Sequence, residues 1–455
     1  MHRALLRQSR LRRPKFLTGL MKIGSISGVC GVPAACAVAS RTYAPWHGGN
    51  KKGFSSSATR YADPNATSPV SSPPRVTDKI IIIPWQQSPA SHYDHFWLRD
   101  HCRCPECYHQ VTRQRLVNTF SIPETIKPSR VNAKPEGLEV IWEDDSHKSL
   151  YDWTWLHHHS YNPSLPQQEV TNLPATITWD AATIFEYPPA VQYKDVMDSD
   201  AGLVKWIENI EIFGFSFVEG VPVDLLKTEE LARRISFIRE THYSKNMWDF
   251  TADLAHADTA YTDLALKAHT DTTYFTDPAG LQLFHLLEFE GKGGESLLVD
   301  GFHVAKQLKE KDPESYEALS TIPISAHSAG DPHVFVRPEP ALFNILRHDP
   351  FTKELSQIRY NNDDRSTLSH LDQSHVHKFY KALRAWNSLL TAPENEYWVP
   401  LKPGKVVIFD NWRVLHGRAA FTGHRRLAGC YLGADDWRSR VRALRMGEDV
   451  KGLVV

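Results

Sequence analysis

The sequence lacks several features that would assign it to common classes of protein. Its 455 residues carry a formal net charge of -1, so no excess of positive charge favours nucleic acid or an anionic membrane as a partner. No apolar run is long enough to span a bilayer. Only six cysteines are present. With 41% hydrophobic and 23% charged residues, we expect a globular protein that has neither nucleic acid nor a membrane as its partner.

Acidic residues are absent before Asp63, whereas arginine and lysine recur through residues 1–22 among leucine, serine and glycine. This composition is typical of a mitochondrial transit peptide, and a basic arm without a targeting role is the alternative. Residues 48–76 are rich in serine, proline, glycine and asparagine, as expected of a linker. We therefore expect residues 1–76 to be a transit peptide with a disordered linker, and the mature protein to lie in the mitochondrial matrix.

Strand-like runs dominate the remaining chain. Runs at 81–85 and 137–145 indicate a small β-rich module over residues 77–185. In residues 186–455, the patterns predict helices at 200–211, 224–239, 304–319 and 375–390, and strands at 213–222, 281–289, 296–300 and 405–411. Because strands and helices do not alternate regularly, the second region is predicted to be a β-barrel or sandwich with flanking helices.

A histidine and an aspartate two positions apart on an extended chain point to the same face and can bind one metal ion. Two histidines and one carboxylate that leave open positions are typical of non-haem iron(II) oxygenases. The pattern alone is weak, because the chain contains four such pairs: His92/Asp94, His256/Asp258, His269/Asp271 and His370/Asp372.

The downstream sequence favours the pair His269/Asp271. A third histidine, His416, follows the predicted strand at 405–411, and Arg425 lies nine positions further on. An arginine on the strand after the last histidine would suit the distal carboxylate of a dicarboxylate cosubstrate.

Alternation along the strand that carries Arg425 makes a further prediction. Arg425 and Tyr431 should share one face, and Cys430 should lie on the other. If Arg425 points into the barrel, Tyr431 does so as well.

Several segments resemble a known enzyme family. HTDTTYF, GGESLLVDGF, IRYNND, LKPGKVVIFDNWRVLHGR and RRLAGCYL are similar to the 2-oxoglutarate dioxygenases that include γ-butyrobetaine hydroxylase and trimethyllysine dioxygenase, with the second group the closer match. The resemblance covers most of residues 77–445. It implies a double-stranded β-helix (jelly-roll) domain, Fe(II), 2-oxoglutarate as cosubstrate, ascorbate and O2, and a small-molecule trimethylammonium substrate.

The resemblance also implies roles for individual residues. His269, Asp271 and His416 match the iron ligands, and Arg425 matches the arginine that binds the distal carboxylate of 2-oxoglutarate. Ser296 matches a position whose hydroxyl supports the cosubstrate.

A trimethylammonium group cannot donate a conventional hydrogen bond, so aromatic faces typically surround it. Core packing is the alternative role for any one aromatic residue. The residues that match the aromatic cage of the family are Trp248, Tyr261 and Tyr431, with Tyr243 as a further possibility.

The polar end of trimethyllysine carries an α-ammonium as well as a carboxylate. An acid in the pocket would favour it over γ-butyrobetaine, and we take Asp258 as that acid, with a turn or helix-capping role as the alternative. Asn361 and Asn362 could also contact polar groups of the substrate.

Cys102, Cys104 and Cys107 place three soft ligands within six residues, and three thiolates with one imidazole form a common structural zinc site. The resemblance implies His147 as the fourth ligand, and three reduced free cysteines are the alternative. The rival histidines are His101, His109, His157, His158 and His159.

Taken together, we expect 3-hydroxylation of N6,N6,N6-trimethyl-L-lysine, the first step of carnitine biosynthesis, with succinate and CO2 as co-products. The alternatives are γ-butyrobetaine hydroxylase, a hydroxylase of a protein side chain, and a zinc-bearing interaction protein without activity. Members of the family are often homodimers, and no residue of this sequence decides that point.

Overall fold

The computed structural model describes residues 69–143, 146–165, 175–242, 244–251 and 262–446. The expected transit peptide lies outside these residues, as do three residues expected to bind substrate, Tyr243, Asp258 and Tyr261. The chain divides into two compact units after Tyr61, and only the second contains described residues. Among the described residues, no helix is both long and apolar enough to cross a membrane.

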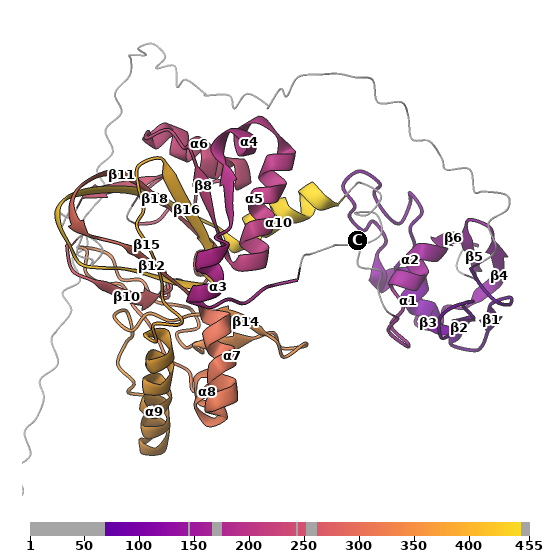
Figure 1. The fold of residues 1–455 in the computed structure, drawn as a ribbon. Coiled ribbons are helices and arrows are strands. Elements are labelled where there is room, and N and C mark those ends of the chain that lie inside the picture. Colours follow the sequence, from indigo (N-terminus) through magenta and orange to yellow (C-terminus); the bar gives the residue numbers. More distant parts are fainter. Residues whose placement is uncertain (1–68, 144–145, 166–174, 243, 252–261, 447–455) are drawn as a thin grey trace, which may run out of the picture. The chain divides into compact units, whose positions relative to one another are not determined.

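The N-terminal module consists of two antiparallel three-stranded sheets and two short helices (Figure 1). Ile81 and Ile83 alternate into its core, where they meet Trp142 and Tyr151 from the second sheet. The elements are β1 (Arg75–Val76), β2 (Ile80–Ile83), β3 (Ser91–Asp94), α1 (His95–Asp100), the 3-10 helix η1 (Thr119–Ser121), β4 (Pro128–Lys134), β5 (Gly137–Trp142), β6 (Lys148–Asp152) and α2 (Trp153–His158).

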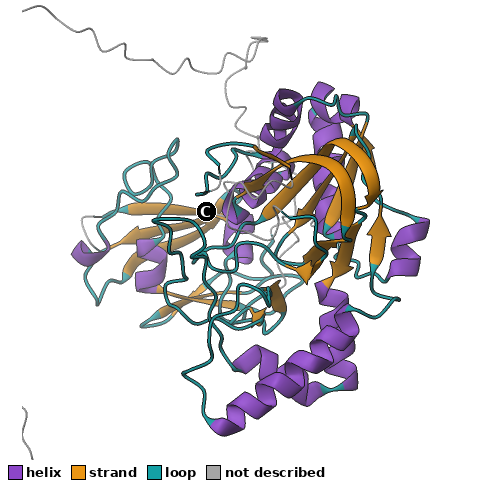
Figure 2. Cartoon of the chain, turned by 90° about the vertical axis from the view of Figure 1, so that its left-hand side faces the viewer, coloured by secondary structure: helices purple, strands orange, loops and turns teal. Residues whose placement is uncertain are grey.

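Two further sheets form the barrel, whose strands curve over one another in Figure 2. The six-stranded sheet has the order β7 (Ala190–Gln192), β8 (Phe215–Glu219), β16 (Lys405–Asp410), β11 (Leu281–Gly293), β18 (Phe421–Leu432) and β9 (Trp248–Thr251). The four-stranded sheet has the order β10 (Leu266–His269), β17 (Val414–Arg418), β12 (Ser296–Asp300) and β15 (Tyr397–Val399). Strands adjacent in space are far apart in sequence, as in the predicted double-stranded β-helix.

Helices cover the outer faces of both sheets (Figure 1). On the six-stranded sheet lie α4 (Tyr193–Asp198), α5 (Asp200–Phe213), α6 (Leu225–Ile235) and α10 (Ala434–Arg445). On the four-stranded sheet lie α7 (Gly301–Lys311), α8 (Pro313–Thr321) and α9 (Gln373–Leu390). A small pair, β13 (Leu346–His348) and β14 (Leu355–Ile358), stands apart from both sheets.

The strand β16 shows why these runs are apolar throughout. Val406 and Ile408 point toward the helices, whereas Val407 and Phe409 point between the two sheets. Both faces of the strand are buried, so a continuous apolar run replaces the alternation of a half-exposed strand.

Three predicted boundaries are wrong for local reasons. The predicted helix at 304–319 is two helices, because Pro313 has no backbone N–H and Asp312 caps the second helix through Ser315 N (3.1 Å). The predicted helix at 224–239 ends at Ile235, since Ser236 is extended. The strand predicted at 281–289 continues to Gly293, where it keeps pairing with β18.

The barrel begins before the expected boundary at residue 185. The Trp179 ring lies 5.4 Å from that of Phe215, and its backbone N–H donates to Asp300 Oδ2 (3.0 Å). The following helix α3 (Ala181–Glu186) packs on β15. Trp179 and α3 therefore belong with the barrel, although they precede residue 185.

A buried ion pair braces the barrel close to His416. Arg413 donates to both carboxylate oxygens of Asp300 (3.2 and 2.8 Å) and to the carbonyl oxygens of Ile212 and Ile177 (2.9 and 2.6 Å). Asp300 also caps helix α7. The pair thus joins the end of β12 to the start of β17.

Candidate metal centre and its pocket

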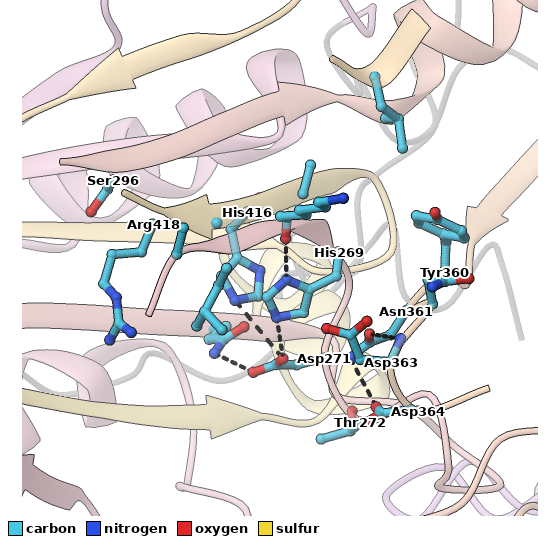
Figure 3. Close-up of a pocket in the computed structure, with 18 of the residues that line it drawn as sticks. His269, Asp271, Thr272, Ser296, Tyr360, Asn361, Asp363, Asp364, His416 and Arg418 are labelled. Carbon is cyan, nitrogen blue, oxygen red and sulfur yellow. Dashed lines mark hydrogen bonds and ion pairs between the residues drawn. The ribbon is translucent and has the colours of Figure 1, made fainter. Parts of the chain in front are cut away.

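The neighbouring strands β10 and β17 bring His269 and His416 together. The two residues are direct partners in the antiparallel pair, and their ring centroids lie 4.3 Å apart. Asp271, two residues beyond His269, turns its Oδ1 toward both rings, 3.1 Å from Nε2 of His269 and 3.8 Å from Nε2 of His416 (Figure 3). The three ligand atoms lie within 4.8 Å of one another.

In two of the remaining His-x-Asp pairs, the aspartate caps a helix. Asp94 accepts from Phe96 N (2.9 Å) and caps α1, and Asp372 accepts from His375 N (2.9 Å) and caps α9. The pair His256/Asp258 lies outside the described residues. In the described ranges, only His269/Asp271 of the four pairs meets a third ligand.

Backbone contacts set the orientation of His269. Its Nδ1 lies 2.7 Å from the carbonyl oxygen of Lys267, which requires a proton on Nδ1 and leaves Nε2, the nitrogen that faces Asp271, as the one that could bind a metal ion. The chain turns sharply just after Asp271, because buried Thr272 has a φ of 57°. That conformation is costly for a β-branched residue, and the Thr272 hydroxyl anchors it by accepting from Ala279 N (2.8 Å).

The electrostatics of the triad favour a cation between its members. Burial opposes charge on His269, but the hydrogen bond and charge of Asp271 raise the His269 pKa to about 9. Burial and the neighbouring His269 lower the pKa of His416 to about 3, so its ring is neutral. Although burial opposes ionisation of Asp271, His416 and His269 hold its pKa below the usual range. A metal ion could replace the proton on His269 and satisfy all three groups.

Three residues hold Asp271, and two of them, Asn411 and Gln282, were not singled out by the sequence patterns. Asn411, buried between β16 and β17, accepts from Asp271 N (2.8 Å) and donates to its carbonyl oxygen (3.0 Å). At the carboxylate, Oδ2 accepts from Gln282 Nε2 (2.6 Å) and from the Tyr431 hydroxyl (2.7 Å). The sequence did not indicate the roles of Gln282 and Asn411, because their contacts with Asp271 join segments that are far apart in the chain.

Arg425 lies in the same pocket and is only 7% exposed. Among the described residues, no carboxylate and no hydrogen-bond acceptor contacts its guanidinium, which lies 5.5 Å from the centre of the Phe421 ring. Burial and the nearby Arg418 lower the Arg425 pKa to about 10, which still leaves it charged at neutral pH. A buried cation without a counter-charge is suited to an anionic ligand.

Arg418 and Ser296 lie near Arg425. Ser296 on β12 is the direct partner of Arg418 on β17, and both line the pocket. Arg418 also donates to the carbonyl oxygens of Thr262 and Leu264 (2.7 Å each). Arg418 was not identified from the sequence, although its position two residues after His416 on one strand places both on the same face.

The predicted alternation of β18 is correct. Arg425 and Tyr431 line the pocket, whereas Cys430 packs in the core beneath the helices. Trp248, on the adjacent strand β9, stands 5.8 Å from Tyr431 between ring centroids, at 57°. Gly429 makes room for this indole, since a Cβ there would lie 2.0 Å from a Trp248 ring atom.

The pocket has a volume of about 750 Å³, within the range of small-molecule sites. Figure 3 shows Ser296 and Arg418 on one side of the metal triad, with the segment from Tyr360 to Asp364 on the other. In that segment, Asn361 donates to Asp364 Oδ2 (2.9 Å), and both residues line the pocket with Asn362 and Asp363. The pocket therefore has a cationic side and an amide- and acid-rich side.

The cysteine cluster of the N-terminal module forms a second group of potential ligands. The Sγ atoms of Cys102, Cys104 and Cys107 lie 3.3, 3.7 and 3.5 Å from His147 Nε2. In a zinc tetrahedron, bonds of about 2.3 Å to sulfur and 2.0 Å to nitrogen place these atoms about 3.6 Å apart. Burial raises the pKa of Cys102 to about 12, so a metal ion would have to displace its proton.

The rival histidines are engaged elsewhere. His101 bonds the carbonyl oxygen of Trp97 through Nδ1 (2.7 Å), His109 accepts from Thr112 N (3.0 Å), and His157 meets Ser88 (2.9 Å). His158, the last residue of α2, contacts the following residue His159. The described ligand group contains none of these five.

Two family models match the sequence. The model described as "Taurine catabolism dioxygenase TauD, TfdA family" matches residues 170–431, and "Gamma-butyrobetaine hydroxylase-like, N-terminal" matches residues 75–157. The taurine dioxygenase structure from Burkholderia xenovorans aligns with 53% of this chain and 84% of its own, at 13% identity and a TM-score of 0.37.

Curated relatives are far more similar in sequence. Trimethyllysine dioxygenase of Meyerozyma guilliermondii is 41% identical over 81% of this chain and 94% of its own. The human protein named "Trimethyllysine dioxygenase, mitochondrial" is 44% identical over 77% of this chain and 82% of its own. Trimethyllysine dioxygenase of Neurospora crassa is 40% identical over 86% of this chain and 88% of its own.

Proposed function

The chain belongs to the TauD, TfdA dioxygenase family and, within it, to the trimethyllysine dioxygenases, and we propose that it hydroxylates carbon 3 of N6,N6,N6-trimethyl-L-lysine. The reaction consumes 2-oxoglutarate and O2, releases succinate and CO2, and begins carnitine biosynthesis. One observation carries the proposal: a single pocket joins the three converging ligand atoms, the buried cation of Arg425 and the aromatic pair Trp248 and Tyr431.

His269, Asp271 and His416 would hold iron(II) through two imidazole nitrogens and one carboxylate oxygen. This donor set fits the ion, because Nε2 of each ring and Oδ1 of Asp271 converge and leave one face open to the pocket. Iron(II), when bound, supplies the chemistry that activates O2 with 2-oxoglutarate as the reductant. The protein keeps the ligands in place through Asn411 and through the Lys267 carbonyl oxygen.

Arg425 would bind the distal carboxylate of 2-oxoglutarate. Because Arg425 is buried, its ion pair with the carboxylate would form in a medium of low dielectric constant, where the attraction is stronger. The adjacent Arg418 adds positive charge. Ser296, opposite Arg418, offers a hydroxyl at the same end of the pocket. These three residues orient the cosubstrate, so that its other end reaches the triad.

Trp248 and Tyr431 would contact the trimethylammonium group, with Tyr261 and Tyr243 as further proposed members of the cage. Their ring faces attract a cation that cannot be hydrogen-bonded directly. At the other end of the substrate, we propose that Asn361, Asn362 and Asp258 bind the α-ammonium and carboxylate groups. Support for the two asparagines is that they line the pocket.

We further propose that the cluster of Cys102, Cys104, Cys107 and His147 binds structural zinc. The spacing of its ligand atoms supports this role, and all four tetrahedral positions would be filled by protein, leaving none for catalysis.

The basic, acid-free residues 1–62 support targeting to the mitochondrial matrix. The mammalian relatives are named mitochondrial.

The direct test supplies purified protein with iron(II), ascorbate, 2-oxoglutarate and air, and compares trimethyllysine with γ-butyrobetaine. We expect trimethyllysine to gain one oxygen atom and succinate to form in equal amount. Hydroxylation of γ-butyrobetaine alone would change the substrate assignment, and absence of succinate with both would remove the proposed reaction.

A further inference from the structure

We infer that Gln282 is a positioning residue for the metal, which acts with the Tyr431 hydroxyl to fix the Asp271 carboxylate in a one-oxygen binding mode. The inference rests on the proposed metal site. It concerns Oδ2 of Asp271, the carboxylate oxygen that faces away from the two histidines.

Gln282 and Tyr431 are direct cross-strand partners on β11 and β18. Their side chains therefore leave the sheet on the same face, side by side. Gln282 Nε2 lies 2.6 Å and the Tyr431 hydroxyl 2.7 Å from Oδ2 of Asp271. Two donors from one cross-strand pair thus converge on one oxygen atom.

Gln282 is a buried amide side chain in an otherwise apolar part of β11. Leu281 and Leu283 alternate with Gln282 toward the helices, and Phe284 follows it on the pocket face. Gln282 is only 1% exposed, and burying an amide without a partner is unfavourable. The hydrogen-bond acceptor for its Nε2 is the Asp271 carboxylate, so the buried amide supports a proposed metal ligand.

Two charge-assisted hydrogen bonds on Oδ2 divide the roles of the two carboxylate oxygens. Oδ1 is left to face the imidazole nitrogens, 3.1 and 3.8 Å away. If Oδ2 were released, the carboxylate could rotate and approach the metal with both oxygens. That mode would occupy a coordination position that the cosubstrate requires. Gln282 therefore preserves the open face of the site as well as the affinity for the ion.

The experiment uses the zinc-replete full-length protein and Mn(II), a hard ion that prefers oxygen and nitrogen ligands to the thiolates of the cysteine cluster. Free Mn(II) is measured by electron paramagnetic resonance, without substrate or turnover. Gln282→Met removes the donor and keeps the volume. The matched control is Gln357→Met, because Gln357 is also 1% exposed but lies on β14, outside the pocket.

We expect Gln282→Met to weaken Mn(II) binding by about 10- to 100-fold, the usual effect of losing such a supporting residue. At saturating Mn(II), the variant should also bind 2-oxoglutarate more weakly, an effect that simple loss of packing would not produce. Gln357→Met should change neither value. Should Gln282→Met fail to fold, Tyr431→Phe removes one oxygen atom and tests the same contact.

Unchanged Mn(II) and 2-oxoglutarate binding in folded Gln282→Met and Tyr431→Phe proteins would overturn this inference alone. Failure of the wild-type protein to bind Mn(II) would overturn the metal site itself, and the inference with it.

Discussion

His269 and His416 face each other as direct partners across the antiparallel pair of β10 and β17. The geometry of the proposed metal site is therefore set by the register of a sheet. A shift of one residue in this pairing would turn one imidazole to the opposite face of its strand. Asn411 restrains the neighbouring ligand by pairing with both backbone groups of Asp271.

Loss of the Arg425 charge should weaken binding of the cosubstrate and leave binding of the metal ion unchanged. Arg425→Gln is expected to raise the Kd for 2-oxoglutarate by at least about tenfold, since it removes a buried charge-assisted contact. Calorimetric titration of 2-oxoglutarate into the Mn(II)-loaded protein measures the change. The control is Arg426→Gln, whose guanidinium lies on the other strand face with Asp249 and Glu288. Equal effects of the two substitutions would contradict the role of Arg425.

The aromatic pair should determine affinity for the trimethylammonium group. Trp248→Leu is expected to raise the KM for trimethyllysine by about 2- to 30-fold, the range for loss of one cation–π contact. The KM for 2-oxoglutarate should stay near its wild-type value. Trp398→Leu serves as control, because that indole is 40% exposed and lies outside the pocket. An unchanged trimethyllysine KM in Trp248→Leu would argue for a packing role only.

Removal of one cysteine should release zinc. Cys104→Ser is expected to lower zinc content from one per chain toward zero and to reduce the Tm of the N-terminal module, since the bound metal stabilises the fold around it. Elemental analysis and calorimetry provide the two readouts. Cys430→Ala should keep its zinc, because Cys430 lies in the barrel core. Full zinc in Cys104→Ser would count against the site.

The buried pair of Arg413 and Asp300 should be important for stability. Arg413→Met leaves the Asp300 carboxylate, which is 1% exposed, without its cation, and should lower the free energy of unfolding by about 3–5 kcal/mol. Urea denaturation gives this value. Lys381→Met breaks the exposed pair with Glu314 and should leave the free energy of unfolding nearly unchanged. Similar losses in both variants would contradict the difference in burial.

His285 should make stability depend on pH. Burial lowers its pKa to about 4 from 6.5, and its ring contacts Thr228 Oγ1 (2.7 Å). Between these two values the unfolded chain binds more protons, so the free energy of unfolding should fall as pH falls, by up to about 1.4 kcal/mol per pH unit. His285→Gln should remove that part of the slope in denaturation curves at pH 7, 6 and 5. The same pH dependence of the free energy of unfolding in the wild-type and His285→Gln proteins would contradict the role of His285.

Local patterns predicted those parts of the site that depend on one strand. The alternation of β18 correctly placed Arg425 and Tyr431 in the pocket and Cys430 outside it. The His-x-Asp pattern did not suffice, since Asp94 and Asp372 use the same spacing to cap helices. Downstream residues had to select among the four pairs.

The supporting contacts could not be predicted in the same way. In the sequence, Gln282 is one polar residue within an apolar strand. Its position beside Tyr431 depends on the register of β11 against β18. Tyr431 was expected to offer a ring face to the substrate, and the structure adds a hydrogen bond from its hydroxyl to Asp271. Contacts between segments so distant in sequence leave no periodic signal in either one.

This pocket should couple decarboxylation of 2-oxoglutarate to hydroxylation of trimethyllysine. The most direct measurement is turnover under ¹⁸O2 with mass analysis of both products. One ¹⁸O atom should enter the hydroxylated trimethyllysine and one should enter succinate, and Asp271→Ala protein should form neither product. A hydroxylated product whose oxygen comes from water, or succinate formed without any product from trimethyllysine, would contradict this coupling.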